Sequence, residues 1–164
     1  MSKIVIALGG NALGNSANEQ LTKAELAAKS IADLITAGHH VVIAHGNGPQ
    51  VGKIRLAFEE TSQKPEDTMP FPECTAMSQG YIGYHLQQAI DEELVSRGLI
   101  DIPVVSMLTQ VVVDPKDPAF SNPTKPIGGY YSEEEAKKLM AETGDVYVED
   151  AGRGWRRVVS AYKP

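Results

Sequence analysis

The sequence predicts an α/β fold built around a mainly parallel sheet. Short runs of aliphatic and β-branched residues alternate with longer segments of helical periodicity, in the order strand, helix, strand, helix, helix, strand. Glycines end the first of these strand-like runs. This alternation is typical of parallel sheets, because parallel strands need a crossover connection that is usually a helix. With 164 residues and 42% hydrophobic content, the chain can bury one sizeable core.

The first half of the alternation covers residues 3–60. The run KIVIAL (3–8) ends at two glycines and predicts a buried strand. A helix should follow, because Thr22 and Glu25 have capping-box spacing and Gly38 supplies a C-terminal stop. HVVIA (40–44) predicts the second strand, and Pro49 suits the first turn of a helix that ends near Glu60.

The second half begins with residues 61–73, whose three prolines predict a loop. A long helix is expected from Thr75 to Arg97, because apolar residues recur on one face and Gly98 follows as a terminator. One stretch of this helix, MSQGYIGY (77–84), predicts close packing at its two glycines. The apolar run 102–113 predicts a return to strand.

The character of the chain changes at Asp114, so we predict a core of residues 1–113 and a protruding subdomain of residues 114–164. Residues 114–129 hold four prolines and two glycines, which predicts a loop. Ser132 and Glu135 form a second capping box, for a helix ending near Met140. DVYVE (145–149) and RRVV (156–159) predict two small strands, and the basic cluster around Trp155 is interpreted as a solvated surface.

Charge and cysteine content narrow the function classes. Fifteen basic against twenty-one acidic residues give a net charge of −6, which argues against a general affinity for nucleic acid. The one cysteine, Cys74, cannot form an internal disulfide. No apolar run approaches the ~20 residues that cross a bilayer. We therefore expect a cytoplasmic protein that binds neither nucleic acid nor membrane.

Two glycine-rich segments, ALGGNALG (7–14) and AHGNGPQVG (44–52), follow the first two strands. In an open parallel sheet, ligands bind beyond the carboxyl ends of the strands. Glycines let backbone amides approach a ligand closely, and a following helix N-terminus favours negative charge. The segments predict a site for a phosphoryl group or a carboxylate, with simple strand-to-helix turns as the alternative. Neither matches the P-loop or the dinucleotide-binding motif.

Five ordered blocks together resemble the carbamate kinases of the amino-acid kinase family: IVIALGGNAL, HGNGPQVG, MSQGYIGY, LTQVVVDPKDPAFSNPTKPIG and EDAGRGWRRVV. The resemblance covers nearly the whole chain. It implies a three-layer α/β/α sandwich with a protruding subdomain, and a homodimer. Carbamate kinases are considerably longer, so the resemblance also implies that this is the N-terminal half, with the ADP-binding half absent.

The resemblance implies an ATP-binding phosphotransferase of arginine catabolism. In the arginine deiminase pathway it would transfer a phosphoryl group reversibly between carbamoyl phosphate and ADP, with Mg²⁺, giving ATP and carbamate. Such a transfer asks a protein mainly to position the reactants and neutralise charge. The implied contacts to the transferring phosphoryl group are Gly9, Gly10 and Asn11, and the implied carbamate side is Gly46, Asn47 and Gly48. Lys125 is implied as a cation that closes over the phosphate, so Lys125, Gly10 and Asn11 are the implied catalytic residues.

Alternatives stay open for several of these residues. An isolated loop lysine such as Lys125 is commonly just solvated. Asn11 and Asn47 also suit left-handed turn positions. His45 is interpreted as structural, because phosphoryl transfer to ADP needs no base there. Ser78, in the long predicted helix, is equally compatible with burial and with ligand contact.

Alternatives also stay open for the whole chain. It could be a truncated, non-catalytic remnant that binds anions or forms dimers. It could also be another amino-acid kinase, acting on a small carboxylate, although TQVVVDP and NPTKPIG argue against that.

Overall fold

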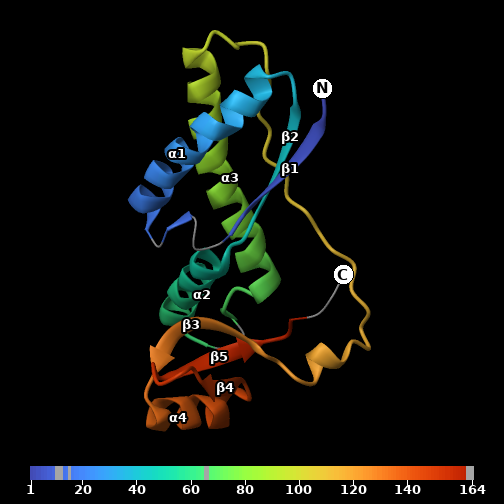
Figure 1. The fold of residues 1–164 in the computed structure, drawn as a ribbon. Helices are drawn as coiled ribbons and strands as arrows, with labels where there is room; N and C mark the ends of the chain where they lie inside the picture. Colours follow the sequence, from blue (N-terminus) through green and yellow to red (C-terminus); the bar gives the residue numbers. More distant parts are fainter. Residues whose placement is uncertain (10–12, 15, 65–66, 162–164) are drawn as a thin grey trace. The chain divides into compact units, whose positions relative to one another are not determined.

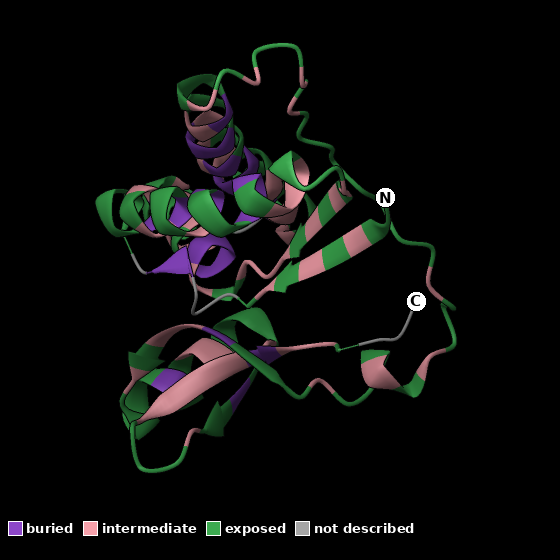
Figure 2. Cartoon of the chain, turned by 45° about the horizontal axis from the view of Figure 1, so that its top comes forward, coloured by how far each residue is buried: buried purple, intermediate pink, exposed green. Residues whose placement is uncertain are grey.

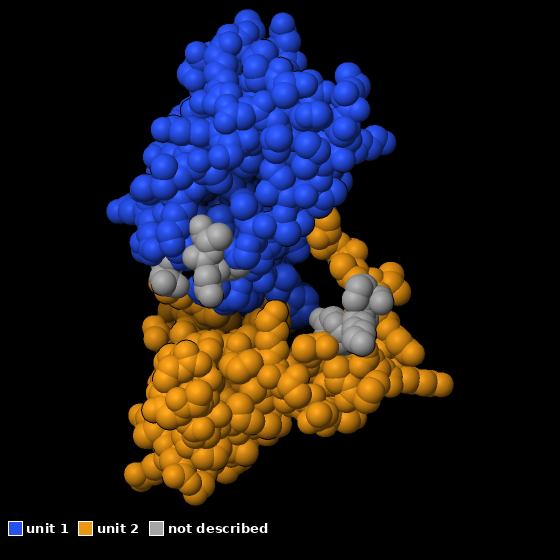
Figure 3. Space-filling model, in the orientation of Figure 1, with its two compact units in different colours: residues 1–51, 72–108 blue, residues 52–71, 109–164 orange. Residues whose placement is uncertain are grey.

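The computed structural model describes residues 1–9, 13–14, 16–64 and 67–161. The chain forms two compact units, coloured separately in Figure 3. Unit 1 consists of residues 1–51 and 72–108, and unit 2 of residues 52–71 and 109–164. Unit 2 thus takes in residues 52–71, which the predicted division at residue 113 assigned to the core.

Unit 1 is built on two parallel strands, β1 (Lys3–Leu8) and β2 (His40–His45). Their register is continuous from the pair Lys3 and His40 to the pair Leu8 and His45. Helix α1 (Ala17–Thr36) makes the crossover between them (Figure 1). The predicted α/β class with a parallel sheet is therefore confirmed.

The core of unit 1 lies between this sheet and helices α1 and α3 (Phe71–Ser96). Residues along β1 and β2 alternate between half-buried and exposed, as Figure 2 shows. Ile6 and Ile43 pack against the helices, whereas Val5 and Val42 on the other face are 71% and 60% exposed. Among the described residues, helices thus cover one face of the sheet and leave its apolar opposite face open.

Helix α1 begins earlier than the sequence predicted. Ser16 is its N-cap, and the Ser16 side chain accepts a hydrogen bond from the backbone N–H of Glu19. The expected cap, Thr22, lies inside the helix and donates its hydroxyl hydrogen to the carbonyl of Asn18. The Thr22 and Glu25 spacing was misleading, because the same polar residues also suit the exposed face of a helix interior.

Helix α3 also begins early, at Phe71 rather than near Thr75. The expected apolar face is buried as predicted, with Ile82 and Leu94 fully enclosed. Gly83 is packed closely, since a Cβ there would lie 2.8 Å from the Ser106 hydroxyl oxygen, but Gly80 faces open space. The predicted close packing is thus right for one of the two glycines.

The predicted strand at 102–113 is wrong. Residues 102–113 form no strand, although Ile102 and Val104 pack against the core of unit 1. Val105 and Val112 are 73% and 92% exposed. A strand requires a neighbour to satisfy its backbone groups, and in the described residues β1 and β2 pair only with each other.

Unit 2 carries a three-stranded antiparallel sheet in the order β3-β5-β4, made of β3 (Lys125–Tyr131), β4 (Val146–Glu149) and β5 (Trp155–Val159). The loop predicted through residue 129 is therefore wrong from Lys125 onward. Pairing with β5 makes the strand, and Gly128, at φ 71°, lies where the register shifts. Before β3, Pro118–Phe120 form a short 3₁₀ helix.

Helix α4 (Glu133–Thr143) packs beside this sheet and confirms the second capping box. The Ser132 hydroxyl accepts from the backbone of Glu135, and the Glu135 carboxylate accepts from the backbone of Ser132. Gly144 ends the helix in the left-handed conformation that glycine tolerates. No helix in the described ranges is long and apolar enough to cross a membrane.

Candidate functional site

The two glycine-rich segments lie beside each other at one edge of unit 1. Leu8 and His45 are the last paired residues of the parallel strands, and the backbone N–H of Gly46 donates to the carbonyl of Leu8 at 2.9 Å. Gly9 follows Leu8 directly and is exposed. The expected shared edge at the carboxyl ends of β1 and β2 is therefore confirmed.

The same hydrogen bond limits what Gly46 can do. Its N–H group is already used in the strand ladder, so it cannot also donate to a ligand. The next helix, α2 (Gly48–Thr61), begins two residues later and leaves the first-turn N–H groups of Gly48 and Gln50 without helical acceptors. Gly48 is exposed, so this helix start presents donors and a partial positive charge at the edge of the sheet.

Asn47 is held between α2 and α3. Its carbonyl accepts from the N–H of Val51 at 2.9 Å, which starts α2. Its side-chain amide donates to the Ser78 hydroxyl oxygen at 2.8 Å, and that hydroxyl donates to the carbonyl of Thr75 at 2.6 Å. Ser78 is completely buried. The left-handed alternative for Asn47 is wrong, because Ala151 alone has a positive φ among the described non-glycine residues.

Other predicted site residues fall in different places. Gly10 and Asn11 lie outside the described residues. His45 is half-buried, and its Nδ1 lies 3.2 Å from the carbonyl oxygen of Gly46, a contact that fits the structural interpretation. Lys125 is exposed at the start of β3, in unit 2, where its pairing with Val159 holds its backbone in a strand.

A row of polar side chains behind the two loops was missed from the sequence. Gln50 and Gln20 are 5% and 1% exposed, and their amides bond to each other at 3.0 Å. Gln50 also donates to the carbonyl of Gly14 at 3.1 Å. Gln50 belongs to the HGNGPQVG motif that drew attention for its glycines. One hint of this burial was present in the sequence. Gln50 is a polar residue in the first turn of a helix, directly before the apolar Val51.

In unit 2, the arginines near Trp155 are not the solvated surface that the sequence predicted. Arg157 bridges Glu59 of α2 at 3.1 Å and Asp145 at 2.7 Å, and its side chain is only 20% exposed. Arg55, one turn earlier on α2, also pairs with Glu59, at 2.6 Å. These ion pairs hold the C-terminal half of α2 against the sheet that carries Lys125.

A second cluster of ion pairs, centred on Asp150, supports the same sheet. Arg156 pairs with Asp150 at 3.3 Å and donates to the carbonyl of Gly128 at 3.1 Å. Hydrogen bonds from Arg153 and then Arg156 lower the pKa of Asp150. On β4, burial raises the pKa of Tyr147 to about 12. Only Arg153, at 60% exposed, behaves as the sequence suggested.

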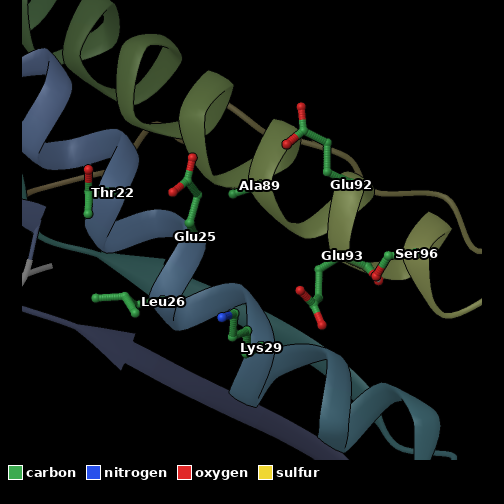
Figure 4. A pocket seen from close by; sticks show the side chains of 8 residues that line it. All are labelled: Thr22, Glu25, Leu26, Lys29, Ala89, Glu92, Glu93 and Ser96. Carbon is green, nitrogen blue, oxygen red and sulfur yellow. The ribbon is translucent and has the colours of Figure 1, made fainter.

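A separate pocket of about 330 Å³ opens between α1 and α3 in unit 1 (Figure 4). Its walls carry three carboxylates and one lysine. None of the predicted site residues lines it. The lining residues are Thr22, Glu25, Leu26, Lys29, Ala89, Glu92, Glu93 and Ser96.

The fold, together with the edge at the carboxyl ends of β1 and β2, defines an α/β protein with paired glycine-rich segments suited to binding an anion. The chain belongs to the amino acid kinase family, whose profile matches residues 2–126. It is 54% identical to a carbamate kinase of Staphylococcus epidermidis over 165 aligned positions, which cover 100% of this chain and 53% of that protein. It is 52% identical to a carbamate kinase-like protein of Escherichia coli, of which it covers 52%.

Solved structures agree with this membership. The structure of carbamate kinase from Giardia lamblia bound to AMP-PNP matches with a TM-score of 0.82 and 45% identity, over 99% of this chain and 52% of that one. A crystal structure from Aeropyrum pernix matches with a TM-score of 0.89 and 42% identity, over 100% and 53%. The chain therefore spans about half the length of the relatives it matches.

Proposed function

We propose that this chain provides the carbamate-binding and phosphoryl-binding part of a carbamate kinase. The reaction is the reversible transfer of a phosphoryl group between carbamoyl phosphate and ADP, which gives ATP and carbamate. The observation that carries the proposal is the pairing of two glycine-rich loops at one sheet edge, fixed by the hydrogen bond from Gly46 to Leu8. The identity of more than half of all positions to a carbamate kinase supports this choice of substrate.

The local chemistry suits small anions. The N–H groups of Gly48 and Gln50 at the start of α2 can donate to a carboxylate or phosphoryl oxygen without loss of helix bonds. Asn47 is oriented by Ser78, which leaves its side-chain oxygen to accept from the amino group of a carbamate. We assign Gly9, Gly10 and Asn11 to the phosphoryl side, and Lys125 to the neutralisation of its negative charge.

We propose that Mg²⁺ enters with the nucleotide. Among the described residues, no group of three or more His, Cys, Asp or Glu side chains is placed to hold a metal ion. These residues do not fit a resident metal site, so we derive no step through the ion. The homodimer, the cytoplasmic location and the role in arginine catabolism stay predictions from the family resemblance.

One observation favours a second function, that of a non-catalytic anion-binding or dimerising module. The outer face of the β1–β2 sheet is apolar and open, with Val5 and Val42 mostly exposed. An exposed apolar face of this kind marks a surface that another protein segment covers. A second copy of the chain would serve this purpose without restoring phosphoryl transfer.

The experiment that tests the proposal measures ATP formation from carbamoyl phosphate and MgADP. The purified chain is assayed alone and mixed with the C-terminal remainder of the Staphylococcus epidermidis relative. Lys125→Ala is compared with Lys116→Ala, a matched control at an exposed lysine of the same proline-rich region. We expect turnover in the mixture, a large loss with Lys125→Ala and little change with Lys116→Ala.

Two results would contradict the proposal. Equal turnover by the two lysine variants would remove Lys125 from the mechanism. Carbamoyl phosphate binding without turnover even in the mixture would favour the non-catalytic module, and analytical ultracentrifugation would then show whether the chain forms dimers.

A further inference from the structure

A continuous chain of hydrogen-bonded polar groups, buried except for the half-buried His85, runs through unit 1 from the end of the first glycine-rich segment to α3. It starts at the backbone carbonyl of Gly14, passes through the side-chain amides of Gln50 and Gln20, and ends at the ring of His85. The three hydrogen bonds measure 3.1, 3.0 and 3.1 Å. The side chains come from α2, α1 and α3 in turn. Buried amides are retained when such bonds satisfy them.

The donors and acceptors along this hydrogen-bond chain are fixed by its first group, the carbonyl of Gly14. A backbone carbonyl can only accept, so Gln50 must turn its Nε2 toward Gly14. The second hydrogen of the same nitrogen goes to Oε1 of Gln20. Gln20 therefore presents its Nε2 to His85, and Nδ1 of His85 must accept. The geometry thus selects a neutral His85 with its proton on Nε2.

The surroundings of His85 agree with a neutral ring. The rings of Tyr81 and Tyr84 lie 5.1 and 5.6 Å from it. Burial lowers the pKa of His85, which favours the uncharged form.

The position of Gln50 gives the hydrogen-bond chain a role beyond packing. Gln50 lies three residues after Asn47, in the first turn of the helix that follows one glycine-rich loop. Its side-chain amide donates to the carbonyl of Gly14, in the segment that contains the other loop. Gly14 is buried, has φ 75°, and a Cβ there would lie 2.7 Å from the Glu19 side chain, so the position requires glycine. One side chain therefore sets the distance between the start of α2 and Gly14, the last residue of the first glycine-rich segment.

We propose that Gln50 is a positioning residue for the anion site, and that Gln20 and His85 hold its amide in the working orientation. This inference rests on the proposed function, since it assumes that the two loops bind one substrate. The side chain of Gln50 touches no reacting atom in this scheme. Its Oε1 has no hydrogen-bond partner among the described residues, so every bond recorded for its amide is made by the nitrogen.

Two substitutions of the same chemical kind separate the roles of the two glutamines. Gln50→Glu removes both donors while it keeps the side-chain shape. Gln20 must then reverse its amide toward the new carboxylate and present Oε1 to the ring, so Nδ1 of His85 has to carry a proton. Gln20→Glu also places an acceptor against His85 and so moves the proton to Nδ1. In that variant, however, Gln50 keeps its bond to Gly14.

The readout is nitrogen NMR of the histidine rings in the whole chain, with His85 assigned by His85→Gln. It is combined with the amide resonance of Gly14 and with calorimetric titration of carbamoyl phosphate. We expect both Glu variants to put a proton on Nδ1 of His85. Only Gln50→Glu should move the Gly14 resonance and weaken carbamoyl phosphate binding, by about tenfold. Gln87→Glu, an exposed position on α3, should change none of these.

An unchanged His85 tautomer in both variants would overturn the hydrogen-bond chain. Equal weakening of binding by the two variants would overturn the positioning role of Gln50. If the unaltered chain does not bind carbamoyl phosphate, the proposed function fails, but the His85 and Gly14 resonances still decide whether Gln50 holds Gly14 through this hydrogen-bond chain. Thermal unfolding checks that each variant is folded, and if Gln50→Glu does not fold, the tautomer in Gln20→Glu is the deciding measurement.

Discussion

The hydrogen bond from Asn47 to Ser78 is the contact that most directly orients a predicted site residue, and its strength can be measured. Replacing Ser78 with alanine removes the hydroxyl that accepts from the Asn47 amide at 2.8 Å. Ser78 is completely buried, so no solvent molecule can easily take the place of the hydroxyl. The Thr75 carbonyl, which also loses a bond, keeps its normal helical partner within α3.

The expected cost follows from these contacts. One neutral hydrogen bond contributes about 1 kcal/mol to stability, and the removed oxygen leaves only a small gap. We therefore expect Ser78→Ala to lower the free energy of unfolding by about 1 kcal/mol, which shifts the urea midpoint by about 0.5 M. Asn47→Ala should have a similar cost, and the double variant should cost less than the sum by about 1 kcal/mol.

The assay is a double-mutant cycle by urea unfolding, followed by circular dichroism. Ser96→Ala is the matched control, because Ser96 lies on the same helix and its hydroxyl likewise donates to the carbonyl three residues earlier, that of Glu93, at 2.7 Å. Ser96 is exposed, so its cycle with Asn47→Ala should show no coupling. A coupling below about 0.3 kcal/mol for the Ser78 cycle would refute the view that Ser78 holds Asn47.

Two further predictions concern unit 2. Ser132→Ala should destabilise the chain by about 1 kcal/mol in urea unfolding, because it removes the cap of α4; a loss no larger than that of the exposed Ser121→Ala would count against the capping role. Burial raises the pKa of Tyr147 from 10.0 to about 12, so the unfolded chain loses the phenol proton first and stability falls as pH rises through this window. Between about pH 9 and about pH 11 the unaltered chain should lose about 1 kcal/mol more than Tyr147→Phe, and equal losses would show that Tyr147 does not contribute.

Much of unit 1 could be predicted because its signals are local. The run KIVIAL and its glycines define β1 to the residue, and HVVIA defines β2 apart from its last residue, His45. Parallel pairing then forces both glycine-rich segments to one edge, since parallel strands end on the same side. The capping box at Ser132 was also found, because its two partners are three residues apart in the sequence.

The errors occur where the deciding partner is distant in the sequence. The run 102–113 has strand composition, but a strand needs a neighbour, and the described chain provides none there. Lys125 to Gly129 look like a loop from their proline and glycines, yet β5, about thirty residues later, turns them into a strand. The start of α1 was missed because Ser16 and Thr22 are both plausible caps by type.

The sequence by itself determined the α/β class, the position of the two glycine-rich segments and the family, because the period of the apolar residues, the placement of glycines and the order of motifs are properties of the sequence alone. Only the tertiary structure decided which groups are held and by what. The Asn47 amide is fixed by Ser78, 31 residues away. Gln50 is fixed by Gly14, 36 residues away. Arg157 is fixed by Glu59, 98 residues away. Hydrogen bonds and ion pairs depend on distances of a few ångströms, and the spacing of residues along a chain does not set such distances until the core has packed.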